Sequence, residues 1–194
     1  MTGNETRHHI IQTGAELIAR QGFSATGINK ILDAAQVPKG SFYHYFRSKD
    51  DFGLAVIEAY AAEYDQRLDD TLGNTALAPL ERLQSYLSLA GDEMASCDYT
   101  KGCLIGNLGQ ELAAQNEAFR SRLDQVFTGW EKRFQTCIVA AQANGEVSTG
   151  IDAAEAASLL LSGWQGALLR AKLSRSEAPL QRFRNLLFDT LLTR

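Results

Sequence analysis

The sequence predicts an all-α protein with about nine helices, because apolar residues recur at helical spacing along most of the chain. Breaks between these stretches fall at helix-ending residues, such as Gly22, Pro38 and the pair Gly73-Asn74. The 194-residue chain is 45% hydrophobic, which is sufficient for one large or two small buried cores.

Three short helices are expected at the N-terminus. The first runs from about residue 4 to residue 21 and ends at Gly22, which acts as a C-terminal cap. Thr26 is placed to cap the second helix, whose apolar stripe comprises Ile28, Ile31, Leu32 and Ala35. Pro38 disfavours helical geometry in the preceding residue and suits a first helical position, so the third helix starts there.

The third helix has an inward face and an outward face. Phe42 and Phe46 are four residues apart and pack inward, which leaves five residues largely facing outward: Lys39, Gly40, Ser41, Tyr43 and His44. Tyr45 supplies a further planar ring with a polar tip, and packing in the core is its alternative role. Charge, small size, hydroxyls and planar rings suit contact with DNA phosphates and base edges. Ser48 then caps a further helix with Asp51 at its N3 position, and Lys49 lies beside the free amides, where phosphates bind.

An ordinary helical hairpin with a purely aromatic core is the alternative. It does not explain Lys39-Gly40-Ser41 at a helix start, where glycine costs helix stability. Residues 22 to 52 resemble, without gaps, the helix-turn-helix of the TetR family of transcriptional repressors, whose signature ends in Lys-Gly-Ser-Phe-Tyr-His-Tyr-Phe, a short turn and a Lys. The resemblance implies a DNA-binding domain at residues 1–50, a ligand-binding and dimerisation domain at residues 51–194, and a double-stranded DNA operator as partner.

Charge is distributed unevenly between these two domains. Residues 1–50 carry six Lys or Arg against four Asp or Glu, whereas the remainder carries thirteen against nineteen, within a total charge of −4. A small basic domain on an acidic body fits a DNA binder whose affinity depends on few phosphate contacts and on dimerisation.

Several classes of protein are disfavoured. No segment approaches ~20 consecutive apolar residues and the N-terminus is too polar for a signal peptide, so we expect a cytoplasmic protein without membrane contact. The three cysteines fit no zinc pattern and are interpreted as reduced thiols. Neither a metal nor a cofactor is expected.

Six helices are expected in the C-terminal domain. Their predicted ranges are 48–72, 78–96, a short helix beginning near 102, 116–143, 153–175 and 179–192. On the short helix, Cys103, Asn107 and Gln110 share one face interrupted by glycines, which favours a pocket wall; close helix packing is the alternative. Trp130 is a further candidate for the pocket, although core packing is usual for such a residue.

The last two predicted helices are apolar on more than one side, and such surfaces usually seek a partner. In the TetR family the corresponding helices form a four-helix bundle with a second subunit. The resemblance therefore implies a homodimer interface that includes Leu160, Leu161, Phe183, Leu187 and Leu191.

Trp164, Leu168 and Lys172 lie at i, i+4 and i+8 on one helix. Lys172 either extends along the surface or reaches the pocket beside Cys103, where a cation would favour the thiolate. The runs Gly102-Cys103-Leu104 and 169–176 resemble the branch of the family that responds to N-ethylmaleimide, quinones and acrylate. That resemblance implies Cys103 as the sensing thiol and Lys172 as its basic neighbour. Trp164, on the same stripe as Lys172, is a further candidate for the pocket.

The sequence therefore predicts a homodimeric repressor that binds a palindromic operator and is released by a small electrophile or acrylate-like effector. One alternative keeps the regulator but gives it a reversible drug-like or acyl ligand without thiol chemistry. A helical thiol enzyme or scavenger is disfavoured, because His8, His9 and His44 all lie in the N-terminal domain, away from Cys103. We therefore expect no enzyme activity.

Overall fold

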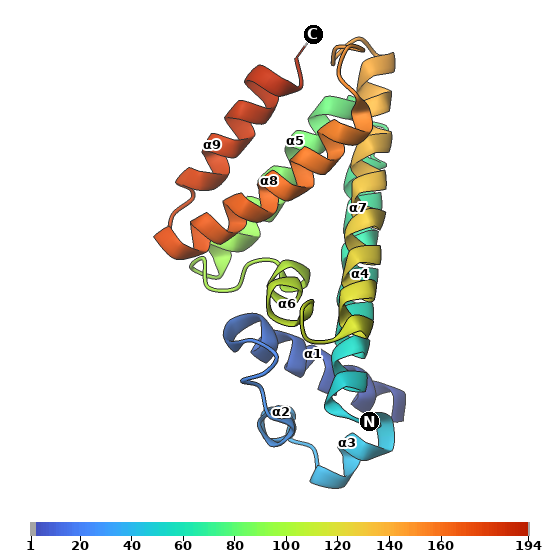
Figure 1. The fold of residues 1–194 in the computed structure, drawn as a ribbon, viewed down its shortest axis with the longest axis vertical. Coiled ribbons are helices and arrows are strands. Elements are labelled where there is room, and N and C mark those ends of the chain that lie inside the picture. The colour runs from blue at the N-terminus through green and yellow to red at the C-terminus, as the bar shows by residue number, and fades with distance from the viewer. Residues whose placement is uncertain (1–2, 194) are drawn as a thin grey trace. The chain divides into compact units, whose positions relative to one another are not determined.

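The computed structural model describes residues 3–193, and within that range it contains nine α-helices, one π-helical turn and no strand (Figure 1). The predicted all-α fold is confirmed. The chain forms two compact units. The first consists of the described residues up to Glu63 together with Cys103–Asp124, and the second consists of Tyr64–Gly102 and the described residues from Gln125 onward.

The first unit contains the three N-terminal helices and part of the body. Its elements are α1 (Gly3–Gln21), α2 (Ile28–Ala35), α3 (Lys39–Tyr45), the start of α4 (Lys49–Leu72), α6 (Leu104–Leu112) and the start of α7 (Glu117–Ala143). Its core includes Phe42, Phe46 and Phe52, whose ring centroids lie 5.1 to 5.5 Å apart. The predicted inward face of α3 is therefore confirmed, and α2 buries Ile31, Leu32 and Ala35 as expected.

The caps of these helices follow the sequence with two exceptions. Pro38, predicted as the first residue of α3, is instead its N-cap, and the helix begins at Lys39. Gly22 has a φ of +88°, which suits glycine, and Ser48 accepts a hydrogen bond from the Asp51 amide at 3.0 Å. The prediction that Thr26 caps α2 is wrong, because the N-cap is Gly27. The Thr26 hydroxyl is buried and donates instead to the Gly22 carbonyl oxygen at 2.6 Å.

The second unit contains the rest of α4 and α7, with α5 (Pro79–Ser96), α8 (Ala153–Ser174), α9 (Ala178–Leu186) and a π-helical turn at Leu187–Leu191. Its largest fully buried side chains are Trp130, Phe134 and Trp164. The last predicted helix is interrupted at Leu187, where the hydrogen bonding changes from α to π.

Several apolar residues of the last two predicted helices, which were expected at a dimer interface, are buried within the chain. Leu160, Leu161 and Leu187 are 0%, 4% and 2% exposed, so they belong to the core of a single chain and offer no surface to a partner. Phe183 and Leu191 are half-buried. The large apolar side chains that α8 and α9 expose to solvent are Leu159, Leu169, Leu173 and Leu186.

Candidate nucleic-acid interface and effector site

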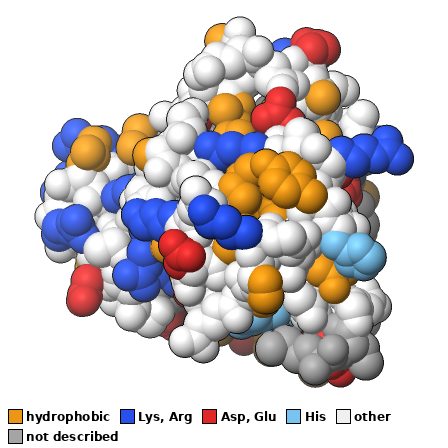
Figure 2. Space-filling model, turned by 90° about the horizontal axis from the view of Figure 1, so that it is seen from below, with side chains coloured by type: hydrophobic (Ala, Val, Ile, Leu, Met, Phe, Trp, Pro, Cys, Tyr) orange, Lys and Arg blue, Asp and Glu red, His pale blue; other side chains and the backbone are white. Residues whose placement is uncertain are grey.

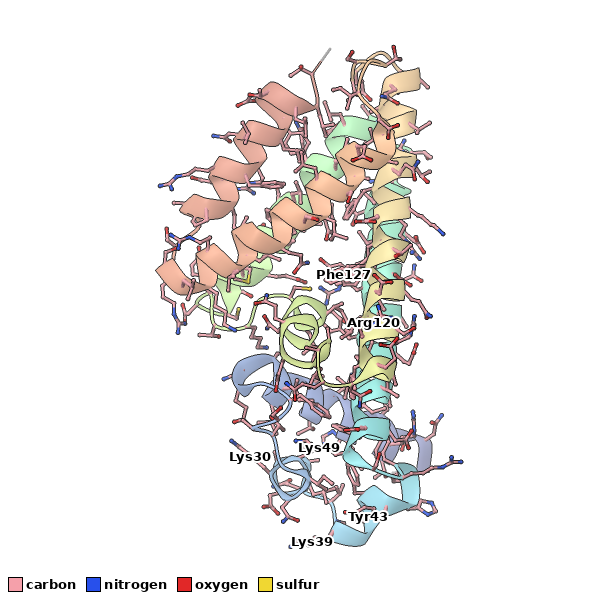
Figure 3. All side chains as sticks on the ribbon, in the orientation of Figure 1. Lys30, Lys39, Tyr43, Lys49, Arg120 and Phe127 are labelled. Atoms are coloured by element: carbon pink, nitrogen blue, oxygen red, sulfur yellow. The ribbon has the colours of Figure 1, made fainter. Side chains whose placement is uncertain are left out.

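The short helix α3 presents most of its predicted outward set to solvent. Lys39, Gly40, Tyr43 and His44 are exposed, and the Tyr43 side chain is 68% exposed while its neighbour Phe42 is 0% exposed. The Tyr43 ring contacts Phe42 edge-on at a centroid distance of 5.4 Å, and most of its surface faces solvent. Figure 3 labels Lys39 and Tyr43 on this helix.

Two further basic residues extend this surface. Lys30 on α2 is exposed and its ammonium donates to the Gln21 side chain, and Arg47 in the turn after α3 is also exposed. Figure 2 shows the molecule from below the view of Figure 1, and lysine and arginine side chains gather on that face with hydrophobic groups among them. Lys30 and Arg47 were not predicted as DNA contacts from the sequence, although both lie outside the apolar stripes.

Lys49, Ser41 and Tyr45 differ from the fully exposed residues of α3. The Lys49 ammonium donates to the Ser24 carbonyl oxygen at 3.2 Å and lies 4.7 Å from the centroid of the Phe23 ring (Figure 3). Both of these contacts of the Lys49 side chain are therefore made within the protein. Ser41 and Tyr45 are half-buried. The Tyr45 ring packs edge-on against His44, with a centroid distance of 4.8 Å.

The predicted pocket wall begins at the N-cap of α6. Cys103 is 9% exposed, and its sulfur accepts a hydrogen bond from the Gly106 amide at 3.5 Å. Free amides in the first turn of a helix stabilise negative charge. Asn107 is half-buried, whereas Gln110 is exposed. The thiol is therefore buried and Asn107 is partly covered, whereas Gln110 faces solvent.

The other three predicted effector residues belong to the second unit. Trp130 is 1% exposed and its indole nitrogen donates to Asp65 Oδ1 at 3.0 Å. Trp164 is equally buried, and its indole nitrogen is the one buried polar side-chain atom among the described residues that lacks a hydrogen-bond partner. The Lys172 ammonium donates to the Lys101 carbonyl oxygen at 3.2 Å, which anchors the end of α8 to the segment before α6.

The other two thiols have separate environments. Cys97 is half-buried and donates to the Met94 carbonyl oxygen. Cys137 donates to the Pro79 carbonyl oxygen at 3.2 Å, and burial raises the pKa of this thiol to about 11. The described part of the chain contains no group of three or more His, Cys, Asp or Glu residues that could hold a metal ion.

An open groove of about 520 Å³ lies in the second unit. Residues of α4 and α5 line it, including Tyr64, Tyr86, Leu89 and Glu93. The Tyr64 and Tyr86 hydroxyls are hydrogen-bonded at 2.6 Å. The six predicted effector residues are not among those lining the groove. None of the helices in the described part is both long and apolar enough to span a bilayer.

A helix-turn-helix with an exposed basic and aromatic second helix, followed by a helical body, defines a DNA-binding transcription regulator. Two family descriptions match the chain: "Bacterial regulatory proteins, tetR family" over residues 10–56, and "Tetracyclin repressor-like, C-terminal domain" over residues 79–187. The chain belongs to the TetR family of transcriptional regulators.

Named relatives agree with this assignment. The transcriptional regulator AcuR of Cereibacter sphaeroides is 45% identical over 90% of this chain and 80% of its own length. The transcriptional repressor NemR of Escherichia coli is 34% identical over 93% of this chain and 90% of its own length. The crystal structure of the reduced form of NemR superposes with a TM-score of 0.91 over 98% of both chains at 32% identity. Because these relatives are regulators, the thiol-enzyme alternative is set aside.

Proposed function

We propose that this TetR-family regulator is a homodimeric repressor that binds a palindromic operator and is released when a small electrophile reacts with Cys103. The observation that carries the effector part is the position of Cys103, whose sulfur caps α6 within the same compact unit as the DNA-reading helix α3. The resemblance of residues 102–104 to the electrophile-responsive branch supports the same choice of thiol.

DNA contact is assigned to the exposed surface of α2 and α3. Lys39, Gly40, Ser41, Tyr43 and His44 supply base and backbone contacts, and Lys30 and Arg47 extend the basic surface. Thr26 and Lys49 support the position of the reading helix from inside the first unit, since both hold the turn between α1 and α2. Tyr45 contributes through its packing against His44.

The dimer interface is assigned to the exposed stripe of α8. One face of α8 carries exposed residues at intervals of three and four: Leu159, Ser162, Gly166, Leu169 and Leu173. No side chain approaches the Cα of Gly166, so a partner helix can come close there. Two reading helices held by this dimer would contact half-sites about one DNA turn, ~34 to 36 Å, apart or at a multiple of that distance.

The effector class follows from the chemistry of a thiol. The Cys103 sulfur would add to the β-carbon of an activated alkene such as acrylate, so that an S–C bond forms, the C=C π bond breaks and the α-carbon takes up a proton. The description of the NemR structure as a reduced form fits a family branch with reactive thiols. A new covalent group at the N-cap of α6 replaces the hydrogen bond from Gly106, and this change provides the free energy for release.

The test compares four proteins on operator DNA that has been located by footprinting the DNA beside the gene. Cys103→Ser should bind the operator like the parent but stay bound in the presence of acrylate or a quinone. Cys97→Ser and Cys137→Ser should be released like the parent. Intact-protein mass spectrometry should show a single adduct that is absent from Cys103→Ser; release of Cys103→Ser without an adduct would contradict thiol sensing.

One observation favours a reversible ligand as a second candidate. The buried Trp164 indole nitrogen has no partner, so it is able to donate to a carbonyl or carboxylate oxygen of a bound molecule. Under this alternative Trp164→Phe would lose its response to the effector, while Cys103→Ser would keep it. Lys172 and Gln110 are proposed to matter in neither case, because the first is bonded to the Lys101 carbonyl and the second is exposed.

A further inference from the structure

Glu111, near the end of α6, accepts two backbone hydrogen bonds from the turn between α1 and α2. The Phe23 amide donates to one carboxylate oxygen at 2.8 Å, and the Ser24 amide donates to the other at 2.7 Å. Glu111 lies 87 and 88 residues away from these two amides in the chain. Charge-assisted bonds of this kind are stronger than bonds between neutral groups.

The turn has free amides because α1 ends at this point. The amide of Gly22 closes the last turn of α1 on the Ile18 carbonyl, and the positive φ of Gly22 then reverses the chain. The next two amides, of Phe23 and Ser24, have no acceptor within a helix, and both donate to the Glu111 carboxylate. A Cβ on Gly22 would come within 3.0 Å of Glu111, so this position also favours glycine for close approach.

Two other elements hold the same turn. Lys49 at the start of α4 donates to the Ser24 carbonyl, and the Phe23 ring packs against Phe119 of α7 with centroids 5.3 Å apart. A Cβ on Gly53 of α4 would come within 2.6 and 2.7 Å of these two rings, which shows how closely they approach the helix. The bonds from Ser24 and Phe23 and the charge of Lys49 outweigh desolvation and lower the pKa of Glu111. The turn is thus fixed to α4, α6 and α7.

The helix α6 connects this turn to the thiol. Cys103 caps one end of α6 and Glu111 is the residue before its last position, and a helix rises about 1.5 Å per residue, so the two positions lie roughly 12 Å apart along one rigid element. The α1–α2 turn leads directly into α2, the first helix of the DNA-reading pair.

We infer that Glu111 is the positioning residue through which the state of α6 is transmitted to the DNA-reading helices. A change at the N-cap of α6 moves the Glu111 carboxylate, and the two amides bonded to it carry the movement to α2 and α3. This inference rests on the proposed function only in naming Cys103 as the site of the change. The contacts that couple α6 to the turn all lie within the first unit. Coupling is reciprocal, so operator binding must also alter the opening of α6 around Cys103.

The experiment measures that reciprocal effect with iodoacetamide as the probe. In a Cys97→Ser/Cys137→Ser background, the labelling rate of buried Cys103 reports how often its surroundings open. The rate is measured with and without operator DNA for the background protein, Glu111→Gln, Glu111→Ala and the control Glu117→Gln. Glu117 is an exposed carboxylate of the same unit that pairs with Arg120 instead of the turn.

Operator should change the labelling rate of the background protein and of Glu117→Gln by at least about fivefold, the low end of usual coupling. In Glu111→Gln a side-chain amide group faces one of the two backbone donors, and in Glu111→Ala water replaces the carboxylate. In both variants, therefore, operator should change the labelling rate of Cys103 by less than about twofold. A purely structural role would lower the unfolding temperature but leave the ratio intact. An unchanged ratio in both Glu111 variants, or no operator effect in the background protein, would overturn the inference.

A separate measurement distinguishes failure of the proposed function. If acrylate fails to release the parent from operator, the assigned effector class is wrong. The labelling ratios still decide the role of Glu111, since iodoacetamide serves there only as a reporter of opening.

Discussion

The indole N–H of Trp130 donates to the Asp65 carboxylate at 3.0 Å, joining α7 to α4 inside the second unit. The ring also packs against Tyr64 with a centroid distance of 4.5 Å. The indole nitrogen is the only polar side-chain atom of Trp130, and it is already hydrogen-bonded to Asp65. Trp130 is therefore part of the core of this unit and offers no free donor to an effector.

Trp130→Phe should therefore lower the free energy of unfolding by about 2 kcal/mol or more, through the lost hydrogen bond and the lost ring volume. Trp164→Phe is a matched control, because that equally buried indole has no partner to lose. Urea unfolding at equilibrium measures both changes. Equal losses in the two variants would show that the bond to Asp65 contributes nothing to stability.

The exposed surface of α3 leads to a prediction about DNA affinity. Lys39→Ala should reduce the slope of log K against log salt by about one unit, because one phosphate contact is lost. Tyr43→Ala should weaken operator binding by about tenfold or more. Lys132→Ala, an exposed lysine in the second unit, serves as the control in fluorescence-anisotropy titrations and should retain the parent slope. Parental affinity in both α3 variants would refute the assignment of this helix.

Lys49→Ala is expected to act differently from Lys39→Ala. Its ammonium bonds to the Ser24 carbonyl, so the variant should lose operator affinity through the α1–α2 turn, with little change in the salt slope. The same salt titration distinguishes the two lysines. A slope reduced by a full unit would instead assign Lys49 a direct phosphate contact, as the sequence analysis predicted.

Cys137 should be nearly inert toward thiol reagents in the folded protein. Burial raises the pKa of its thiol from 9.0 to about 11, so at pH 7.5 the reactive thiolate fraction falls by roughly a hundredfold. Alkylation followed by peptide mass spectrometry should show Cys137 labelled only after unfolding in urea. Rapid labelling of Cys137 in the native protein would show that its surroundings open without global unfolding.

The ion pair between Glu58 and Arg122 predicts an acid-sensitive contribution to stability. Hydrogen bonding to Arg122 lowers the pKa of Glu58, so the pair stabilises the folded state above the ordinary carboxyl pKa of about 4.3 and loses that effect as pH falls through the lower folded value. Glu58→Gln should be less stable than the parent at pH 7, and the difference should disappear toward pH 3. Glu16→Gln, at an exposed position of α1, provides the control in urea titrations at each pH.

The sequence alone determined the all-α fold, the helix-turn-helix and the inward positions of Phe42 and Phe46, because spacing, glycine and proline act locally. The same local signals placed Ser48 and Asp51 in their cap. The outward set of α3 was identified by elimination once its inward face was known, and its contact with DNA remains a proposal.

Only the tertiary structure showed which apolar residues are buried and which distant groups are in contact. Leu160 and Leu187 lie on apolar faces, but only packing shows that they are buried within one chain, leaving Leu159 and Leu173 exposed. Glu111 gave no sequence signal, because its two partners lie 87 and 88 residues away and are backbone amides. Backbone donors are the same at every non-proline residue, so the fold alone determines which of them a distant carboxylate reaches.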